Sequence, residues 1–214
     1  MGIPVLILGE SGTGKTTSLR NLDADRTALI QAVSKPLPFK SNFKPRDSKA
    51  QTGTVNVCDN SDQIIKLMRG ASQAGFKVII IDDFQYVMAN EFMRRSAETG
   101  FNKFTEIAKH AWDIAMAAQA LPVDVRVYLL SHTQTDDQGN TKIKTIGKLL
   151  DEKITLEGLF TIVMRTLRID GKYLFSTQNN GHDTVKTPMD MFPEDTIEND
   201  LQMVDNAITA YYEI

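Results

Sequence analysis

The sequence predicts an α/β protein with a mainly parallel sheet flanked by helices and an antiparallel β-hairpin extension toward the C-terminus. Short apolar runs alternate with helical stretches through the first 131 residues. Val78 to Ile81 is apolar and β-branched without alternation, which is typical of a central strand buried on both faces. Asp170-Gly171 separates two strand-like runs, and Asp-Gly is a strong two-residue hairpin turn.

The same patterns place the individual elements. Strands are expected near residues 3–8, 27–32, 54–58, 77–82 and 124–131, and helices near 14–22, 60–70 and 102–120. The hairpin strands are expected at 161–169 and 172–177. An amphipathic last helix is indicated by the helical spacing of Ile197, Leu201, Val204, Ile208 and Tyr211. We expect one domain over 1–214, with a core at about 1–135 and the hairpin and C-terminal helix at about 136–214.

Composition limits the function classes. The chain has 214 residues, 42% of them hydrophobic, and a net charge of −3, which is too mild to indicate a nucleic-acid or membrane partner by itself. The single cysteine, Cys58, cannot form an intramolecular disulfide, and we expect no signal peptide. No apolar run approaches the roughly 20 residues of a membrane span. We therefore expect a cytoplasmic protein without a membrane partner.

Residues 9–16 read Gly-Glu-Ser-Gly-Thr-Gly-Lys-Thr, the G-x-x-x-x-G-K-[ST] phosphate loop, between an apolar strand and a helical stretch. Its glycines let successive N–H groups converge on a phosphate, and the following helix adds its positive dipole end. Lys15 can reach the β- and γ-phosphates, and Thr16 can offer its hydroxyl to Mg²⁺. The loop predicts bound ATP and Mg²⁺. The residues expected to hold the nucleotide are Gly9, Glu10, Ser11, Gly12, Thr13, Gly14, Lys15, Thr16 and Thr17.

A second motif follows the strand at 77–82. Asp82 stands where the acid that supports Mg²⁺ is found, at the carboxyl end of a parallel strand. Asp83 is a candidate to orient the attacking water, and Asp59, at the end of an earlier strand, is the competing candidate. Either could instead be a helix N-cap or a turn residue. Which carboxylate acts stays open at this point.

The fifth expected strand ends in Ser131-His132-Thr133-Gln134. His132 and Gln134 are candidates to sense the γ-phosphate and to couple it to the following loop. The alternative is an ordinary polar strand exit before the turn at 136–140.

The early phosphate loop, the VIIIDD strand and the SHTQ strand end resemble the compact RecA-like P-loop ATPases encoded by bacteriophages, a family grouped with single-strand annealing and recombination. Two further segments also fit that family, namely residues 146–148 leading to 160–166, and residues 179–183. The resemblance covers roughly residues 1–190. It implies a RecA-like core, ATP, Mg²⁺, DNA-stimulated hydrolysis to ADP and phosphate, and a homo-oligomeric ring or filament with sites between subunits. A phage single-strand binding protein is a further expected partner.

The chain departs from the larger recombinases in two ways. We expect no N-terminal domain or polymerisation arm ahead of the first strand, and Asp59 stands where RecA carries a glutamate. Both departures concern how the chain oligomerises and how fast it hydrolyses ATP.

Local basic segments are the candidates for single-stranded DNA binding, because phosphate contacts require cations. In a RecA-like core the loops after the magnesium strand and after the next strand face DNA, here roughly 89–103 and 133–153. A third segment, 35–49, interleaves cations with Phe39 and Phe43, which suits charge contacts and base stacking. The alternative is a solvated loop whose phenylalanines pack on the core. The candidate residues are Arg94, Arg95, Lys103, Lys142, Lys144, Lys148, Lys40, Lys44 and Arg46.

Arg165 and Arg168, on the first hairpin strand, are candidates to reach the γ-phosphate of a neighbouring subunit. The alternative is pairing with a surface carboxylate.

The leading function is a Mg²⁺-dependent ATPase acting on single-stranded DNA in phage recombination or replication. A helicase-loader or initiator-type AAA+ ATPase is an alternative, but it requires a helical lid where this chain predicts a hairpin. A nucleotide-gated DNA-binding module with little hydrolysis is another. A small-molecule kinase is disfavoured because no Arg-rich lid is found.

Overall fold

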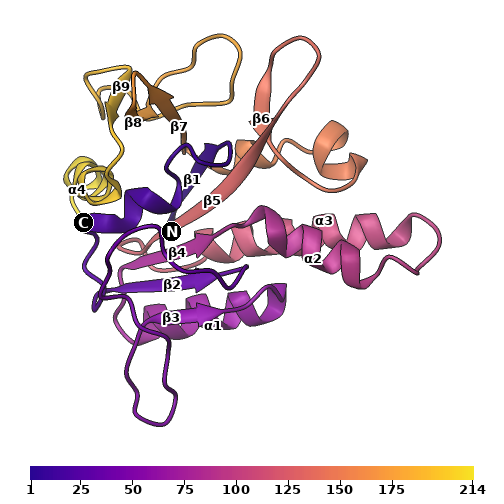
Figure 1. Cartoon of the computed structure of the whole chain (residues 1–214), viewed down its shortest axis with the longest axis horizontal. Coiled ribbons are helices and arrows are strands. Elements are labelled where there is room, and N and C mark those ends of the chain that lie inside the picture. Colours follow the sequence, from indigo (N-terminus) through magenta and orange to yellow (C-terminus); the bar gives the residue numbers. More distant parts are fainter.

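The computed structural model describes all 214 residues and contains one sheet of nine strands with helices on both faces (Figure 1). The strand order is β3-β2-β4-β5-β1-β7-β8-β9, and β6 pairs with β5 outside this order. The pairs among β1 to β5, and the pair β1–β7, are parallel, whereas β5–β6, β7–β8 and β8–β9 are antiparallel. The strands are β1 (Ile3–Gly9), β2 (Thr27–Gln31), β3 (Val55–Val57), β4 (Val78–Asp82), β5 (Arg126–Thr135), β6 (Thr141–Ile143), β7 (Ile162–Ile169), β8 (Lys172–Ser176) and β9 (Thr196–Glu198). The expected α/β fold with a C-terminal antiparallel hairpin is confirmed.

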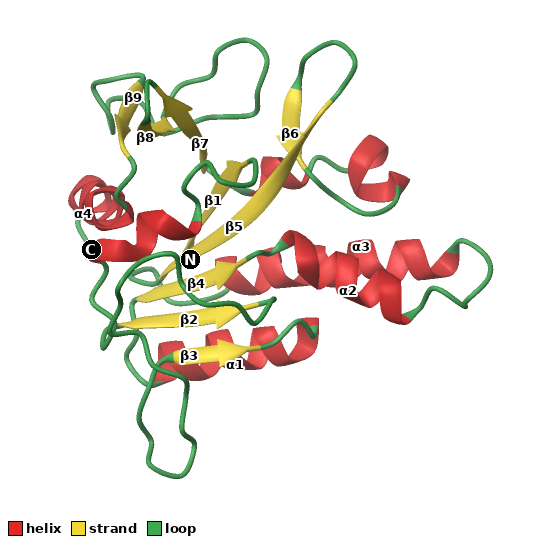
Figure 2. Cartoon of the chain, viewed as in Figure 1, coloured by secondary structure: helices red, strands yellow, loops and turns green.

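Four α-helices and three short helices complete the chain, as the red ribbons of Figure 2 show. None of these helices has the length and apolar character needed to cross a membrane. They are η1 (Thr16–Asn21), α1 (Ser61–Gln73), α2 (Gln85–Arg94), α3 (Asn102–Gln119), η2 (Leu149–Lys153), η3 (Leu156–Leu159) and α4 (Leu201–Tyr212).

Two hydrophobic clusters occupy the two faces of the sheet. The larger cluster lies under α1, α2 and α3, and the smaller one lies under η1 and α4. Successive side chains of β4 enter the two clusters in turn, with Ile79 and Ile81 in the larger one and Val78 and Ile80 in the smaller one. Because both faces are covered, β4 carries no polar side chain before Asp82.

The hairpin turn forms where the sequence predicts it. Ile169 pairs with Lys172, and Asp170 and Gly171 have φ values of 50° and 78°, the positive values that a type I′ turn requires.

Several expected elements differ from the structure. The helix expected at 14–22 is the short 3₁₀ helix η1, because Gly14 has φ 103° and cannot be helical. The loop expected at 89–103 is shortened by α2, which extends to Arg94. Residues 133–153 are not one loop either, since β5 continues to Thr135 and pairs with β6. Ile197 lies in β9 rather than in the last helix.

The register of the parallel strands determines which residues meet. Gly9 of β1 is opposite His132 of β5, and Gln31 of β2 is opposite Asp82 of β4. The carboxyl ends of these strands therefore share one edge of the sheet, which is where ligands bind in open α/β sheets.

Candidate functional site

The phosphate loop turns over the carboxyl end of β1. Gly12 and Gly14 have φ values of 79° and 103°, a backbone region that favours glycine. The Lys15 ammonium donates hydrogen bonds of 2.8 Å to the carbonyls of Gly9 and Glu10. Burial lowers the pKa of Lys15 to about 8, although nearby carboxylates oppose this shift. The loop thus presents a buried cation whose two carbonyl partners can be exchanged for phosphate oxygens. The predicted nucleotide residues Gly9, Glu10, Ser11, Gly12, Thr13, Gly14, Lys15, Thr16 and Thr17 form this turn and the start of η1.

Thr166 of β7 supports the loop from behind. Its hydroxyl lies 2.6 Å from that of Thr13 and 3.2 Å from the carbonyl of Leu8. A Cβ added to Gly9 would lie only 1.9 Å from Thr166 Oγ1, so glycine is required for this close approach. Sequence analysis missed Thr166 because no local motif marks a residue 153 positions beyond its partner.

Thr16 and Asp82 face each other across the edge of the sheet. Thr16 Oγ1 lies 3.1 Å from both carboxylate oxygens of Asp82. Asp82 is fully buried, and burial, helped by the neighbouring charge of Asp83, raises its pKa to about 6. A hydroxyl and a buried carboxylate at the phosphate loop match the expected magnesium residues.

The donor set of this edge fits Mg²⁺. No three His, Cys, Asp or Glu side chains gather into a metal cluster in the chain. Mg²⁺ is usually held by one or two carboxylates together with substrate phosphates and waters, rather than by a cage of protein ligands. Thr16 and Asp82 supply the protein part of such a site.

Asp83 is buried in an unusual backbone conformation beside this pair. Its φ is 62°, and it is 2% exposed. Its carboxylate forms an ion pair with Lys35, and its other oxygen lies 3.7 Å from His132 Nε2. Burial would raise the pKa of Asp83, but His132 and Lys35 more than offset that effect and lower it. Strained non-glycine residues of this kind concentrate at functional sites.

Lys35 is the member of this cluster whose role sequence analysis missed. It follows β2, whose carboxyl end lies at the same edge as that of β4. The sequence pattern assigns Lys35 only to the basic segment 35–49, although its place after a strand next to β4 is a topological signal for this edge.

Asp59 lies apart from the cluster. Its carboxylate accepts hydrogen bonds from Asn90 at 2.8 Å and from Arg94 at 2.6 Å. Burial would raise the pKa of Asp59, but these two donors, Arg94 first, lower it. Asp59 follows β3, and β2 separates β3 from the magnesium strand β4. Asp59, a candidate for the catalytic carboxylate, and Arg94, a candidate DNA contact, therefore form an ion pair with each other.

His132 and Gln134 separate in the structure. His132 faces Asp83 and contacts the ring of Tyr86 edge-on, with 5.9 Å between ring centroids. Gln134 instead donates a hydrogen bond of 2.5 Å to Asp151 on η2. Only His132 therefore joins the cluster, and Gln134 links β5 to the following segment.

Two of the expected DNA-binding cations are already paired with other groups of the protein. Arg95 pairs with Glu91, Glu98 and Glu106, at 2.9, 2.8 and 2.7 Å. Lys103 is 8% exposed, and its ammonium donates to two backbone carbonyls. Contrary to our expectation, the structure does not present either side chain as a free surface cation, because each is already fully paired.

Other expected cations are exposed. Lys40, Lys44 and Lys144 lie at the surface, and Lys148 is 87% exposed with a 3.5 Å contact to Glu152. Lys142 pairs with Asp151 at 2.7 Å. Arg46 is exposed and binds the side chain and carbonyl of Gln51 and the carbonyl of Gly53. In segment 35–49, Phe39 and Phe43 are partly buried and pack against the smaller hydrophobic cluster, as the alternative interpretation of this segment expects.

Arg165 and Arg168 differ in exposure. Arg165 lies 3.9 Å from Asp183, and its side chain is 18% exposed. Arg168 is exposed and lies over the ring of Tyr173, 5.4 Å from its centroid. Arg168 is therefore the more accessible of the two candidates for contact with a neighbouring subunit.

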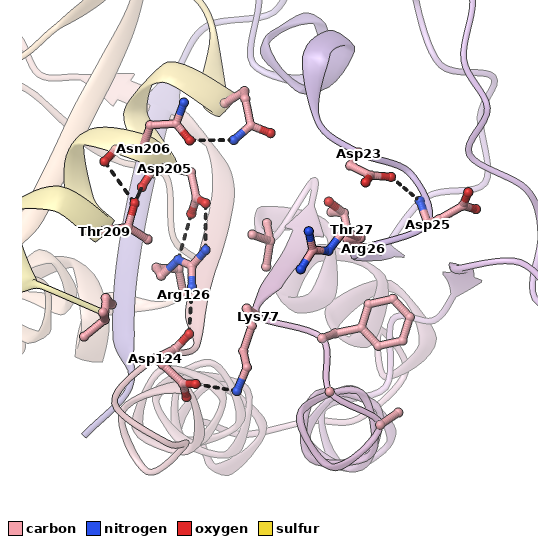
Figure 3. A pocket seen from close by; sticks show the side chains of 16 residues that line it. Asp23, Asp25, Arg26, Thr27, Lys77, Asp124, Arg126, Asp205, Asn206 and Thr209 are labelled. Atoms are coloured by element: carbon pink, nitrogen blue, oxygen red, sulfur yellow. Dashed lines mark hydrogen bonds and ion pairs between the residues drawn. The ribbon is translucent and has the colours of Figure 1, made fainter.

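A pocket of about 610 Å³ lies at the opposite edge of the sheet, where β2, β4 and β5 begin (Figure 3). Arg126 forms two hydrogen bonds with Asp205, at 2.9 and 2.7 Å, and Tyr128 donates to Asp205 at 2.6 Å. Lys77 pairs with Asp124 on the same wall. These groups satisfy one another and attach α4 to β5, which is a structural role.

The sequence model of the AAA domain family matches residues 1–188. No curated protein sequence matches the chain significantly.

Two solved structures resemble the chain at low identity. One is a KaiC-like protein from the hyperthermophilic archaeon Pyrococcus horikoshii OT3, with 13% identity over 82% of this chain and 77% of that chain and a TM-score of 0.44. The other is the P4 protein from bacteriophage phi6 in complex with ADP, with 11% identity over 81% of this chain and a TM-score of 0.42. This chain covers 57% of the phage protein.

Proposed function

The chain belongs to the AAA domain family, and from this premise we propose that it binds ATP with Mg²⁺, hydrolyses it to ADP and phosphate, and acts on single-stranded DNA. The observation that carries the proposal is the contact between Thr16 and Asp82 beside the buried Lys15 ammonium. Two motifs 66 residues apart thereby form one site at the carboxyl edge of the sheet.

Binding is the first task of these residues. The N–H groups of the phosphate loop and the Lys15 ammonium would hold the phosphates, with Lys15 leaving the carbonyls of Gly9 and Glu10. Thr16 would be a direct ligand of Mg²⁺, and Asp82 would support it, usually through a water. Mg²⁺ held by these residues would supply positive charge to offset the negative charge that develops on the phosphates.

Asp83 is the favoured carboxylate for orienting the attacking water. Asp83 is adjacent to Asp82, and its lowered pKa keeps the carboxylate ionised at neutral pH. His132 Nε2 lies 3.7 Å from one of its oxygens. Asp59 is disfavoured because it follows another strand and its carboxylate already accepts hydrogen bonds from Arg94 and Asn90. We assign His132 the role of coupling the state of Asp83 to β5.

The proposed DNA contacts are the exposed cations. Lys40, Lys44 and Arg46 lie on the segment between β2 and β3, and Lys144 and Lys148 lie on the segment after β6. On a protein with a net charge of −3, each of these two segments offers the local cations that phosphate contact needs. The resemblance to phage recombination ATPases supports a role in phage recombination or replication, with a phage single-strand binding protein as a further partner.

A homo-oligomeric ring or filament is part of the proposal. Arg168, exposed on the hairpin, is the favoured candidate to reach a neighbour's γ-phosphate, with Arg165 second. The observed β7–β8 hairpin, in place of a helical lid, favours this type of assembly over a helicase loader.

A nucleotide-gated module with little hydrolysis is the second candidate, because the Asp83 carboxylate that would orient water already forms an ion pair with Lys35. Phosphate release from ATP, with and without single-stranded DNA and with Lys15→Ala as the blank, tests the proposal. Faster release on adding DNA supports it. Intact ATP binding with near-zero release under both conditions supports the second candidate instead.

A further inference from the structure

Asn199, between β9 and α4, carries a buried side-chain amide without a hydrogen-bond partner. The residue is 1% exposed, and neither its Oδ1 nor its Nδ2 forms a hydrogen bond within the chain. A buried amide in this state costs stability, so a ligand that supplies its missing partners is favoured. Asn199 also lies beyond residues 1–188, the part of the chain that the family model matches. The family match therefore gives no account of this side chain.

The Asn199 amide lies against the phosphate loop. A Cβ added to Gly14 would lie 3.1 Å from Asn199 Oδ1, 3.3 Å from Asn199 Nδ2 and 2.9 Å from Cδ1 of Tyr173. The Asn199 N–H donates to the Tyr173 carbonyl at 3.2 Å and continues the pairing of β8 with β9. Glycine at position 14 thus lets the loop backbone come close to an amide that has both a free donor and a free acceptor.

The main chain at Asn199 is fixed to the helix that follows the phosphate loop. Arg20 of η1 donates to the Asn199 carbonyl and pairs with Glu198 at 2.9 Å. The next residue of η1, Asn21, donates to Asp200 Oδ2 at 2.7 Å. Because of these bonds, the junction of β9 and α4 stays beside η1 (Figure 1), and its amide keeps its place next to the loop.

The strand order places Asn199 on the side of the loop where we expect the sugar of a bound nucleotide. β4, which carries Asp82, lies to one side of β1, and β8 and β9 lie to the other side. In the proposed function Thr16 and Asp82 mark the position of Mg²⁺, and hence of the terminal phosphates. A triphosphate that begins there and follows the loop directs its nucleoside toward β8 and β9. The sugar is the part of the nucleoside next to the phosphates, so it reaches Asn199 before the base does.

The proposed binding step also gives the sugar access to the buried amide. The Lys15 ammonium bonds to the carbonyls of Gly9 and Glu10 and must leave them to bind phosphate oxygens. This change occurs next to Gly14, where φ is 103° and the backbone has the freedom of glycine. Movement of the loop at this point uncovers the amide that lies against it.

We propose that Asn199 is a specificity-determining residue that binds the two ribose hydroxyls of the nucleotide. This inference rests on the proposed ATPase function and names the part of the nucleotide that the same site selects. Nδ2 donates to one hydroxyl, and Oδ1 accepts from the other. A pair of hydroxyls suits an amide, because each hydroxyl can donate and accept. The site therefore prefers a ribonucleotide to an analogue that lacks these hydroxyls.

Isothermal titration calorimetry of the full chain with Mg²⁺ tests this with three ligands: ATP, dideoxy-ATP without the two ribose hydroxyls, and inorganic tripolyphosphate. The wild type is expected to bind ATP about 10-fold more tightly than dideoxy-ATP, the scale of hydrogen bonds to a buried amide. Asn199→Ala is expected to bind ATP about 10-fold more weakly than the wild type and to bind the two nucleotides equally. Its affinity for tripolyphosphate should stay unchanged, because that ligand has no sugar.

Two further variants separate binding from folding. Asn206→Ala makes the same change at an exposed asparagine of α4 and should bind all three ligands as the wild type does. Asn199→Leu fills the space of the amide and should lose the preference for ATP over dideoxy-ATP. Its melting temperature without nucleotide should equal or exceed that of the wild type, because a buried amide without partners is removed.

Equal binding of ATP and dideoxy-ATP by the wild type overturns the inference. So does a loss of affinity in Asn199→Ala that tripolyphosphate shares, because the amide then supports the loop and not the sugar. A loss that ATP and dideoxy-ATP share but tripolyphosphate does not would assign the amide to the base and overturns it as well. If wild type and Lys15→Ala bind ATP equally, the proposed function itself fails.

Discussion

Thr16 and Asp82 stand 66 residues apart in the chain, yet Thr16 Oγ1 lies 3.1 Å from both oxygens of the Asp82 carboxylate. The parallel register produces this contact, because β5 pairs with both β1 and β4 and aligns their carboxyl ends. The phosphate loop and the acidic strand end therefore act as one site, and the predictions below follow from it.

Lys15→Ala is expected to weaken ATP binding about 10- to 100-fold, the effect of losing charge-assisted hydrogen bonds to phosphate. Isothermal titration calorimetry in the presence of Mg²⁺ measures the affinity. Lys66→Ala makes the same change of charge far from the loop and should bind as the wild type does. An unaltered affinity in Lys15→Ala would place the nucleotide elsewhere.

Asp82→Asn is expected to stabilise the protein without metal and to abolish Mg²⁺-dependent turnover. The pKa of Asp82 is raised to about 6 by burial, so its proton is bound more tightly in the folded state. The stability from this proton is fully present below the unfolded pKa and is lost as the pH rises through about 6. The gain at pH 7.5 should be about 1–3 kcal/mol, and it should be smaller at pH 5.

Urea denaturation in EDTA at the two pH values measures this effect of Asp82→Asn. Asp137→Asn, at an exposed turn, is the control for the change of charge and should leave stability nearly unchanged at both pH values. A loss of stability in Asp82→Asn that is equal at the two pH values would show that the buried charge is not the cause.

Gly9→Ala is expected to destabilise the fold by about 1–3 kcal/mol, because its Cβ would lie 1.9 Å from Thr166 Oγ1. In a Thr166→Ala background the cost should be smaller, because the clashing hydroxyl is gone. Denaturation of the four proteins of this cycle measures the coupling. Gly70→Ala, in open space on α1, should instead stabilise by about 0.5–1 kcal/mol. Purely additive effects in the cycle would show that contact with Thr166 does not cause the destabilisation by Gly9→Ala.

Arg126→Ala is expected to cost about 3–5 kcal/mol of unfolding free energy, because it leaves the buried Asp205 carboxylate without its cationic partner. ATP affinity of the folded protein should stay unchanged, since this pocket lies at the opposite edge of the sheet from the phosphate loop. Arg168→Ala, at an exposed arginine, provides the comparison for stability. A large loss of ATP affinity in Arg126→Ala would make the pocket of Figure 3 part of the nucleotide site.

Much of the fold could be predicted because its signals are local. The unbroken apolar run before Asp82 identified the central strand β4, and Asp170-Gly171 identified the hairpin. The helix α2 was missed because its first residues also suit a strand-end turn. The strand β6 was missed because its three residues form only by pairing with an extended β5, and no local pattern reports that pairing.

The residues of the candidate site likewise divide into those that a local sequence pattern identifies and those that it does not. The phosphate loop is contiguous, so its spacing alone identified Lys15 and Thr16. The partners of Asp83 could not be found so directly, because Lys35 and His132 reach it from two other strand ends. Ion pairing also decided which cations are free, and Arg95 shows that a basic residue in the expected loop can be fully neutralised by neighbouring glutamates.

The central claim is that Asp83, next to the Thr16–Asp82 pair, makes this site hydrolyse ATP. The most direct test measures ATP affinity and phosphate release side by side in the wild type and in Asp83→Asn, with Mg²⁺ and single-stranded DNA present. The account predicts that Asp83→Asn binds ATP about as tightly as the wild type and releases phosphate at least about 100-fold more slowly, the scale of a lost catalytic group. Equal release by the two proteins would contradict it and return Asp59 to consideration.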